Sequence, residues 1–154
     1  MDKAKEIIKK IIYITIATVD EDGQPWNTPV FGAYDKNCNF YWGSHVDSQH
    51  SKNIRRNDKV FLVIYDSTVP AGQGEGVYIQ ALTNRLENPE EISLAHKLLW
   101  DRHIVPYWKL EEVQASSPVN LYKATPQKIW VNDEGQVDGH YVDIRNEINL
   151  RQFK

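Results

Sequence analysis

Short strand-like runs, each closed by a turn signal, constrain the fold of this chain more than any other feature. Residues 12–19 (IYITIATV) are rich in β-branched side chains and end at the DEDG run of 20–23, a hairpin signal. Residues 25–35 continue as a strand, in which Pro25 and Pro29 favour a sheet edge or a bulge because proline donates no ladder hydrogen bond. The pattern therefore predicts antiparallel strands joined by hairpins.

The rest of the chain repeats this pattern, with helices between some of the strands. Alternation and turn residues, including a last turn at Glu134-Gly135, predict further strands at 40–44, 59–66, 76–87, 119–126, 127–133 and near 137–144. Helical spacing and capping residues predict helices at 3–12, at about 48–56 and from Pro89 to about Arg102, and residues 104–117 stay ambiguous. The strand–helix alternation of a parallel sheet is missing. The fold class is therefore mainly β, an antiparallel barrel or sandwich with flanking helices.

Length and composition bound the organisation of the protein. The chain has 154 residues, which suits one domain over residues 1–154. Its one cysteine, Cys38, excludes an intramolecular disulfide, and the five histidines show no H-E-x-x-H pair that would predict a metal site. No apolar run reaches the roughly 18 residues of a membrane span, and the start of the chain lacks a secretory cleavage site. We therefore expect a cytoplasmic protein with neither membrane nor metal.

Positive charge is concentrated in one short segment of an acidic chain. The net formal charge is −3, yet residues 48–59 (SQHSKNIRRNDK) carry +3, which leaves −6 on the remainder. A small cationic island favours a small anionic partner over a polyanion. Aromatic residues make up 11% of the chain and could stack on bases, but this charge balance argues against a nucleic-acid partner.

The same segment begins with residues suited to binding a phosphate. Asp47 or Ser48 can cap the expected helix, and a helix N-terminus offers backbone N–H groups and a dipole that favours an anion. Ser48 and Lys52 are four residues apart and share a helix face, with His50 and Ser51 between them. A phosphate monoester site and a capped surface helix both fit this pattern.

The run FYWGSHVDSQHSKNIRRNDKVFLVIYD (40–66), followed by GVYI and preceded by DEDGQPWNTPVFGAYD, resembles the pyridoxamine 5′-phosphate oxidase-like flavoproteins. The resemblance covers about residues 5–88, with a weaker match at LYKATPQKIWV near the C-terminus. It implies an antiparallel split β-barrel that binds FMN at the interface of a homodimer. Related split barrels bind a deazaflavin instead.

The resemblance also implies which residues contact the cofactor. The contacts fall into four groups, along the ring edge, beside the ribityl chain, at the phosphate and from the partner subunit: Asn27, Thr28, Pro29 and Val30; Tyr41, Trp42, Gly43 and Ser44; Ser48, Gln49, His50 and Lys52; Gln80 and Trp130. The family's oxidases often have arginine or lysine where Asn27, Gln49 and His50 stand, which leaves Lys52 as the substitute cation.

These observations lead to one main functional hypothesis and two alternatives. The main hypothesis is an FMN-binding oxidoreductase that acts on an unidentified small molecule. Because the flavin would carry the redox chemistry, no side chain is expected to act as acid, base or nucleophile. The alternatives are a non-catalytic flavin or small-ligand binding module, which neutral residues at 27 and 49 favour, and a deazaflavin-dependent reductase. Trp26, Trp42 and Trp130 suit either ring walls or simple packing.

Overall fold

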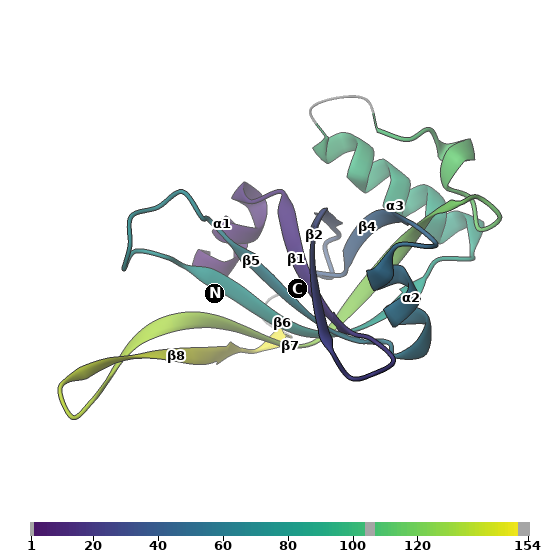
Figure 1. Ribbon diagram of the computed structural model, residues 1–154. Helices are drawn as coiled ribbons and strands as arrows, with labels where there is room; N and C mark the ends of the chain where they lie inside the picture. Colours follow the sequence, from purple (N-terminus) through teal and green to yellow (C-terminus); the bar gives the residue numbers. More distant parts are fainter. Residues whose placement is uncertain (1, 104–106, 151–154) are drawn as a thin grey trace.

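The computed structural model describes residues 2–103 and 107–150 as a curved sheet with helices around it (Figure 1). Its elements follow one another along the chain: α1 (Asp2–Lys10), β1 (Tyr13–Val19), β2 (Pro25–Phe31), β3 (Ala33–Tyr34), β4 (Phe40–His45), α2 (Gln49–Arg56), β5 (Lys59–Tyr65), β6 (Gly76–Arg85), α3 (Pro89–Arg102), the 3₁₀ helix η1 (Leu110–Val113), β7 (Val119–Val137) and β8 (His140–Ile148).

The sheet is antiparallel and open. Its strands run in the order β2-β1-β5-β6-β7-β4-β3, and β8 pairs with the distal part of β7. Within the described residues β2 pairs only with β1, so it lies at a sheet edge, as Pro25 and Pro29 predicted. The prediction of a mainly β, antiparallel split barrel is confirmed, and the sheet does not close on itself.

The two strands expected at 119–126 and 127–133 are one long strand, β7. The ladder with β6 pairs Gln80 with Lys128 and then Ala81 with Pro126, so Gln127 is an extra residue on β7. This β-bulge bends the strand without ending it, and a bulge is one of the few places where a sheet admits a proline such as Pro126. The sequence break was therefore a bulge rather than a turn.

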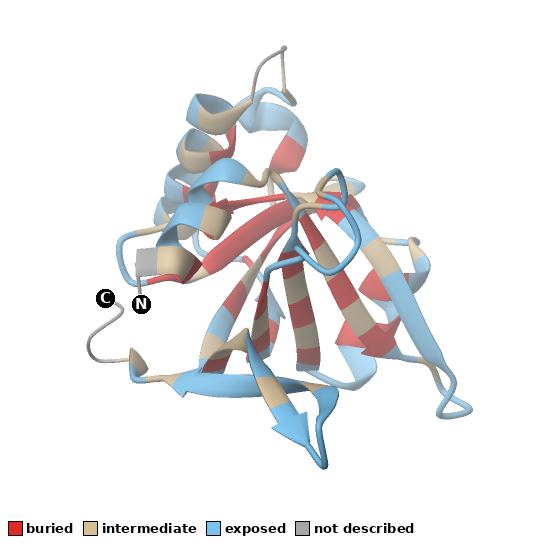
Figure 2. Cartoon of the chain, turned by 90° about the vertical axis from the view of Figure 1, so that its left-hand side faces the viewer, coloured by how far each residue is buried: buried red, intermediate tan, exposed pale blue. Residues whose placement is uncertain are grey.

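The prediction of a turn at Glu134-Gly135 is also wrong. The chain reverses at Asp138 and Gly139, whose φ angles of 51° and 77° are the left-handed values that a two-residue hairpin requires. Asp and Gly adopt such values at low cost, whereas Glu134 would be strained there. Gly135 instead lies inside β7 opposite Val142. The β7–β8 hairpin consequently extends away from the rest of the sheet, and its residues are mostly exposed (Figures 1 and 2).

The main core lies inside the curved sheet. Trp42 and Tyr122 stack at its centre with ring centroids 5.7 Å apart, and both are essentially unexposed. Helix α1 adds Ala4 and Ile8 to this core, and α2 adds Ile54. Burial of these apolar surfaces joins the two helices to the sheet.

A second core lies on the other side of β4, beneath α3 and η1. Leu99 of α3 and Val113 of η1 pack there with Tyr41 of β4 and Leu121 of β7. Helix α3 begins where Asn88 caps it, since the Asn88 side chain accepts hydrogen bonds from the backbone N–H groups of the first helical turn. The ambiguous segment 104–117 contains η1, and its residues 104–106 lie outside the described part of the chain.

Strands β1, β5, β6 and β7 have a second face, less buried than the first, which we call the outer face. Along β1 and β5 every second residue is buried and the others are half-buried or exposed (Figure 2). The residues that point outward from β1, β5, β6 and β7 include many apolar ones: Tyr13, Ala17, Val19, Phe61, Val63, Tyr65, Tyr78, Leu82 and Trp130.

Candidate functional site

Four of the expected cofactor contacts lie together on the outer face. Residues paired directly across antiparallel strands point to the same side of the sheet, so the ladder places them in rows. One row is Pro29, Thr15, Val63, Tyr78 and Trp130, and the next is Asn27, Ala17, Phe61, Gln80 and Lys128. Asn27, Pro29, Gln80 and Trp130, which come from distant parts of the sequence, thus occupy two neighbouring rows.

The edge strand β2 also presents unpaired backbone groups beside these rows. The N–H of Gly32 donates to the carbonyl of Ile12, which places the even-numbered residues of β2 in the hydrogen-bonded pairs with β1. The backbone groups of Asn27, Pro29 and Phe31 therefore point to the free edge. That edge offers N–H donors from Asn27 and Phe31 and carbonyl acceptors from all three residues.

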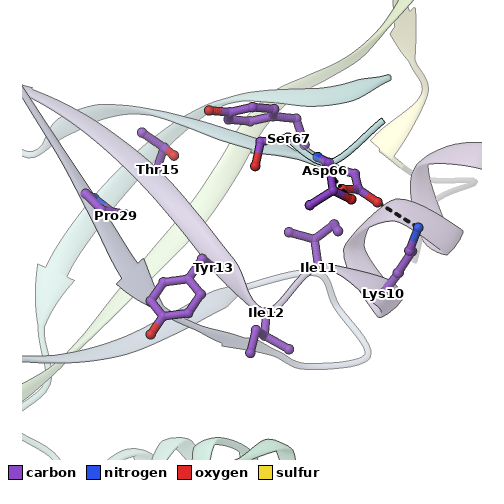
Figure 3. Close-up of a pocket in the computed structure, with 10 residues that line it drawn as sticks. Lys10, Ile11, Ile12, Tyr13, Thr15, Pro29, Asp66 and Ser67 are labelled. Atoms are coloured by element: carbon purple, nitrogen blue, oxygen red, sulfur yellow. Dashed lines mark hydrogen bonds and ion pairs between the residues drawn. The ribbon is translucent and has the colours of Figure 1, made fainter. Parts of the chain in front are cut away.

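Two hollows open on the outer face, one at each end of the β1 and β5 strands. A groove of about 500 Å³ runs beside Phe61, Gln80 and Leu82. A second hollow of about 350 Å³ lies where Tyr13, Pro29 and Tyr65 meet the end of α1 (Figure 3). Mostly apolar walls with a few polar groups are the usual character of small-molecule sites.

An ion pair forms one side of the second hollow. The ammonium of Lys10 lies 2.7 Å from the carboxylate of Asp66 (Figure 3). Asp66 also accepts hydrogen bonds from the backbone N–H and the hydroxyl of Thr68. The hydrogen bond from Lys10 has the largest effect and those from Thr68 add to it, and together they hold the pKa of Asp66 well below its ordinary value. This carboxylate therefore stays ionised across the neutral range.

Two of the expected phosphate contacts, Ser48 and His50, lie beside Ser44 at the start of α2. The hydroxyl of Ser44, at the end of β4, lies 2.7 Å from Nε2 of His50 and 3.1 Å from the hydroxyl of Ser48. Ser44 and His50 are buried, and burial lowers the pKa of His50 below its ordinary value of 6.5. The His50 side chain is therefore held inside the fold beside Ser44, and its expected contact with phosphate stays a prediction.

The remaining expected residues of α2 are exposed. The side chain of Gln49 donates to Asn53 on the next turn, at 2.8 Å. Lys52 is exposed and, with Arg55 and Arg56, lines a polar hollow on the outside of the helix. Lys52 is thus free to turn its ammonium toward an anion near the start of the helix, which is the position that the sequence assigned to it.

Several expected contacts have side chains that are taken up by packing. Val30 and Trp42 lie in the main core, so of the two interpretations of Trp42 the structure supports packing. The hydroxyl of Tyr41 donates to Asp35 at 2.9 Å, inside the second core. Tyr107 and Trp108 cover Gly43, where a Cβ would lie 2.5 Å from the Tyr107 hydroxyl oxygen. The side chains of Tyr41 and Trp42 are therefore committed to packing, and Tyr107 hydrogen-bonds the backbone of Gly43.

Thr28 is the remaining expected contact on β2. It is half-buried on the inner side of β2, where its hydroxyl accepts a hydrogen bond of 3.0 Å from the indole N–H of Trp26. Trp26 is 45% exposed, so a ligand could still cover its ring.

Sequence reasoning missed Phe61, Tyr13 and Tyr65. Phe61 stacks on Trp130 with ring centroids 6.3 Å apart, between Asn27 and Gln80 on the outer face. The signal was present in the alternation of 13–19 and 59–65, in which the odd-numbered residues form a second, largely apolar face.

The histidines and acidic residues form no metal site in the described ranges. Among residues 2–103 and 107–150 no group of three or more His, Cys, Asp or Glu side chains is placed to hold a metal ion. His96 instead bonds the carbonyl of Trp108 at 2.7 Å. None of the helices in these ranges has the length and apolar character needed to cross a membrane.

Comparison with known protein families identifies the class of this protein. The family model for pyridoxamine 5′-phosphate oxidase matches residues 1–133. The chain therefore belongs to the pyridoxamine 5′-phosphate oxidase family, as the sequence resemblance implied. A search of the curated proteins finds no match to the chain.

Solved structures with the same fold come from proteins of several descriptions. HutZ, the heme storage protein from Vibrio cholerae, is 17% identical with a TM-score of 0.69, over 82% of this chain and 90% of HutZ. An F420 reductase is 19% identical with a TM-score of 0.62, over 82% of this chain and 94% of the reductase. A candidate 5-nitroimidazole antibiotic resistance protein from Bacteroides thetaiotaomicron is 14% identical with a TM-score of 0.70, over 84% and 81% of the two chains. Similarity at this level establishes the fold alone.

Proposed function

We propose that this protein binds FMN at the interface of a homodimer and acts as an oxidoreductase on a small molecule. The observation that carries the proposal is the free edge of β2, which presents unpaired backbone groups beside the aromatic rows of the outer face. Membership of the pyridoxamine 5′-phosphate oxidase family supports the choice of FMN.

The residues at this edge fit the ring of a flavin. An isoalloxazine is flat and apolar over its faces and carries N–H, carbonyl and ring-nitrogen groups along one side. The free edge of β2 offers the complementary backbone N–H and carbonyl groups of Asn27 and Phe31 and the carbonyl of Pro29. The exposed ring of Trp26 and the outer-face aromatics supply apolar surface nearby.

The start of α2 fits the phosphate of the same cofactor. Helix α2 packs against β1 and β2, and its Asn53 donates to Thr18 of β1, so the helix lies beside the strand pair that ends at this edge. Backbone N–H groups, the hydroxyl of Ser48 and the ammonium of Lys52 would bind the phosphate oxygens. Asn27 and Gln49 are neutral, so Lys52 is the one fixed cation among the expected contacts.

A second copy of the chain would complete the site. The outer face exposes Tyr13, Val19, Tyr65 and Leu82 by 38–57%, and an apolar face of this kind is typically covered by a partner. In a two-fold dimer the same face meets itself, so Gln80 and Trp130 of one protomer would reach the cofactor of the other. We place this homodimer in the cytoplasm.

The chain's own residues would bind and orient the cofactor and keep water from it. The flavin, when bound, would supply the electron transfer to or from the substrate. Backbone groups of β2 would set the polarity at the ring edge, and the partner's outer face would exclude solvent from the ring.

An absorption spectrum of the purified protein with and without added FMN tests the proposal. We expect stoichiometric uptake that quenches flavin fluorescence, and a mass that identifies the bound compound. A released deazaflavin would keep the fold and change the electron partner, as in the F420 reductase that shares the fold. A colourless protein that takes up neither compound would contradict the proposal.

The neutral residues Asn27 and Gln49 favour a second candidate, a binding module without turnover. With few fixed charges at the phosphate, such a module would take up and release its ligand readily. The discriminating measurement is reduction of the bound flavin by NADH or NADPH under anaerobic conditions, followed by reoxidation with candidate acceptors. Bound flavin that no donor reduces would support the module.

A further inference from the structure

Ser48 stands at the N-cap of α2 but does not cap the helix. A serine at this position usually accepts a hydrogen bond from the backbone N–H of the second or third helical residue. The Ser48 side chain makes no such bond and contacts the hydroxyl of Ser44 instead. In the same turn the hydroxyl of Ser51 is fully buried and has no partner. The first turn of α2 is therefore left with unsatisfied polar groups.

Ser48 is the outer end of a three-membered relay that leads into the protein. His50 Nε2 lies 2.7 Å from the Ser44 hydroxyl oxygen, which lies 3.1 Å from the hydroxyl oxygen of Ser48. His50 and Ser44 are 7% and 6% exposed, whereas Ser48 is half-buried and reaches solvent. The inner members are thus shielded, and only Ser48 can touch a ligand.

We propose that His50 and Ser44 are positioning residues, and that proton uptake by His50 turns the Ser48 hydroxyl outward to donate to a bound phosphate. This inference rests on the proposed function, because it takes the start of α2 as the phosphate site. The inference adds that proton binding to His50 regulates how this site binds an anion.

The direction of the relay follows from the donors that each group has. The structure places Ser44 as donor to Ser48, and a hydroxyl hydrogen can rotate to another acceptor. When Nε2 of neutral His50 carries no proton, Ser44 donates to Nε2 instead and Ser48 donates inward to Ser44. Ser48 then presents only lone pairs to the outside. When Nε2 gains a proton from solvent, it donates to Ser44, Ser44 donates to Ser48, and the Ser48 O–H is released to donate to an anion. One proton is taken up, and no covalent bond to carbon changes.

Few charged groups compete with this effect. Helix α2 packs against β1, β2 and β6, and β1 and β2 contain no charged residue. The single charge of β6, Arg85, pairs with Glu87.

Around α2 itself, His45 at the end of β4 and Asp47 on the following loop have largely exposed side chains, and Arg56 pairs with Glu21. Lys52 is exposed on the outside of the helix, and Arg55 donates to the carbonyl of Val46 at 2.7 Å, just before the helix begins. Burial alone lowers the pKa of His50, so a bound anion would act on an otherwise uncompensated imidazole.

Sulfate is the probe for the test, because its charge does not change between pH 5 and pH 8, whereas phosphate monoesters titrate in this range. The His50 pKa is followed by NMR of the imidazole with and without sulfate. We expect sulfate to raise this pKa, and the affinity for sulfate to increase as pH falls, by up to about tenfold per pH unit for uptake of one proton.

Variants separate the relay from a general charge effect. His50→Gln should remove the pH dependence, and Ser44→Ala should flatten it while His50 still titrates. His140→Gln, on the distant β7–β8 hairpin, is the matched control and should leave both curves unchanged. A His50 pKa that sulfate does not change, measured on the unmodified protein, would overturn the inference even if a variant failed to fold.

The outcome also distinguishes this inference from the proposed function. If sulfate raises the His50 pKa and Ser44→Ala flattens the pH dependence, but FMN is not taken up, the relay stands and the flavin proposal fails. If FMN binds and the His50 pKa stays constant on binding sulfate and FMN, the flavin proposal stands and the relay fails.

Discussion

The inner and outer faces of the sheet are built from alternate residues of the same strands, yet they differ in how far their side chains are buried. Ile16 and Leu62, on the inner face, have no exposed surface, whereas Tyr13 and Tyr65, on the outer face, remain more than half exposed. The inner face is filled by helices and by stacked aromatics, so it holds the fold together. The outer face also carries many apolar side chains, and within the described residues Tyr13, Val19, Tyr65 and Leu82 stay 38–57% exposed, so its role lies in contacts with other molecules.

The largest effect is expected from the inner face. Leu62→Ala should lower the free energy of unfolding by about 2–5 kcal/mol, because the fully buried side chain leaves a cavity among packed neighbours. The matched control is Val63→Ala, the next residue on the same strand, which points outward and should cost within about 1 kcal/mol. Urea unfolding of both variants at one protein concentration measures the difference. Equal costs would show that the two faces are not distinct.

The next effect concerns assembly. Phe61→Asp places a charge in the middle of the outer face, where a partner would have to bury it. We expect the free energy of dimerisation to become less favourable by about 3 kcal/mol, which weakens dimer affinity by more than about 100-fold. Sedimentation velocity over a range of concentrations measures this change. Ser93→Asp, on the exposed side of α3, is the control and should leave assembly unchanged. A Phe61→Asp protein that dimerises normally would remove the outer face from the interface.

A smaller effect is expected at the start of α2. Lys52→Ala should weaken FMN binding by about 1–3 kcal/mol, since it deletes the one fixed cation assigned to the phosphate. Fluorescence titration of FMN measures the change, with Lys36→Ala in the β3–β4 turn as a control of equal charge. Unchanged affinity in the Lys52 variant would remove this residue from the site.

The smallest effect is on stability as a function of pH. Burial lowers the pKa of His50 in the folded protein, so the unfolded chain binds a proton first as pH falls below the ordinary value of 6.5. The free energy of unfolding should therefore decrease from pH 7.5 to pH 5.5 in the absence of an anion. Denaturant unfolding across this range measures the slope, and His50→Gln should reduce it. A slope that His50→Gln leaves intact would assign the dependence to other groups.

The features that could be predicted from the sequence are those that depend on residues close together in the chain. Pro25 and Pro29 correctly indicated an edge strand, and Pro89 correctly indicated the first turn of α3. The break near residue 127 was assigned as a boundary between two strands, because only the pairing with β6 shows that it is a bulge within one strand.

Much of the candidate site depends on contacts across the sheet, which the sequence does not encode locally. Trp42 suits a ligand wall by type, and only its stacking on Tyr122 shows that it belongs to the core. Phe61 was overlooked because its position between Gln80 and Asn27 follows from the strand order rather than from any motif. The grouping of β2, β4 and α2 residues came from the family resemblance, and their chemical roles remain predictions.

The prolines of β2 also bear on the solubility of the protein during folding. Both prolines occupy positions whose backbone nitrogen points to the free edge, so two of the donors that an added strand would need are absent there. An open sheet edge is a template for aggregation, and proline is one of the ways in which natural proteins block it. A flat ligand needs only one or two groups along the edge, whereas an incoming strand needs the whole ladder. This chain can therefore keep an edge open for a small molecule while discouraging cross-β association between partly folded copies.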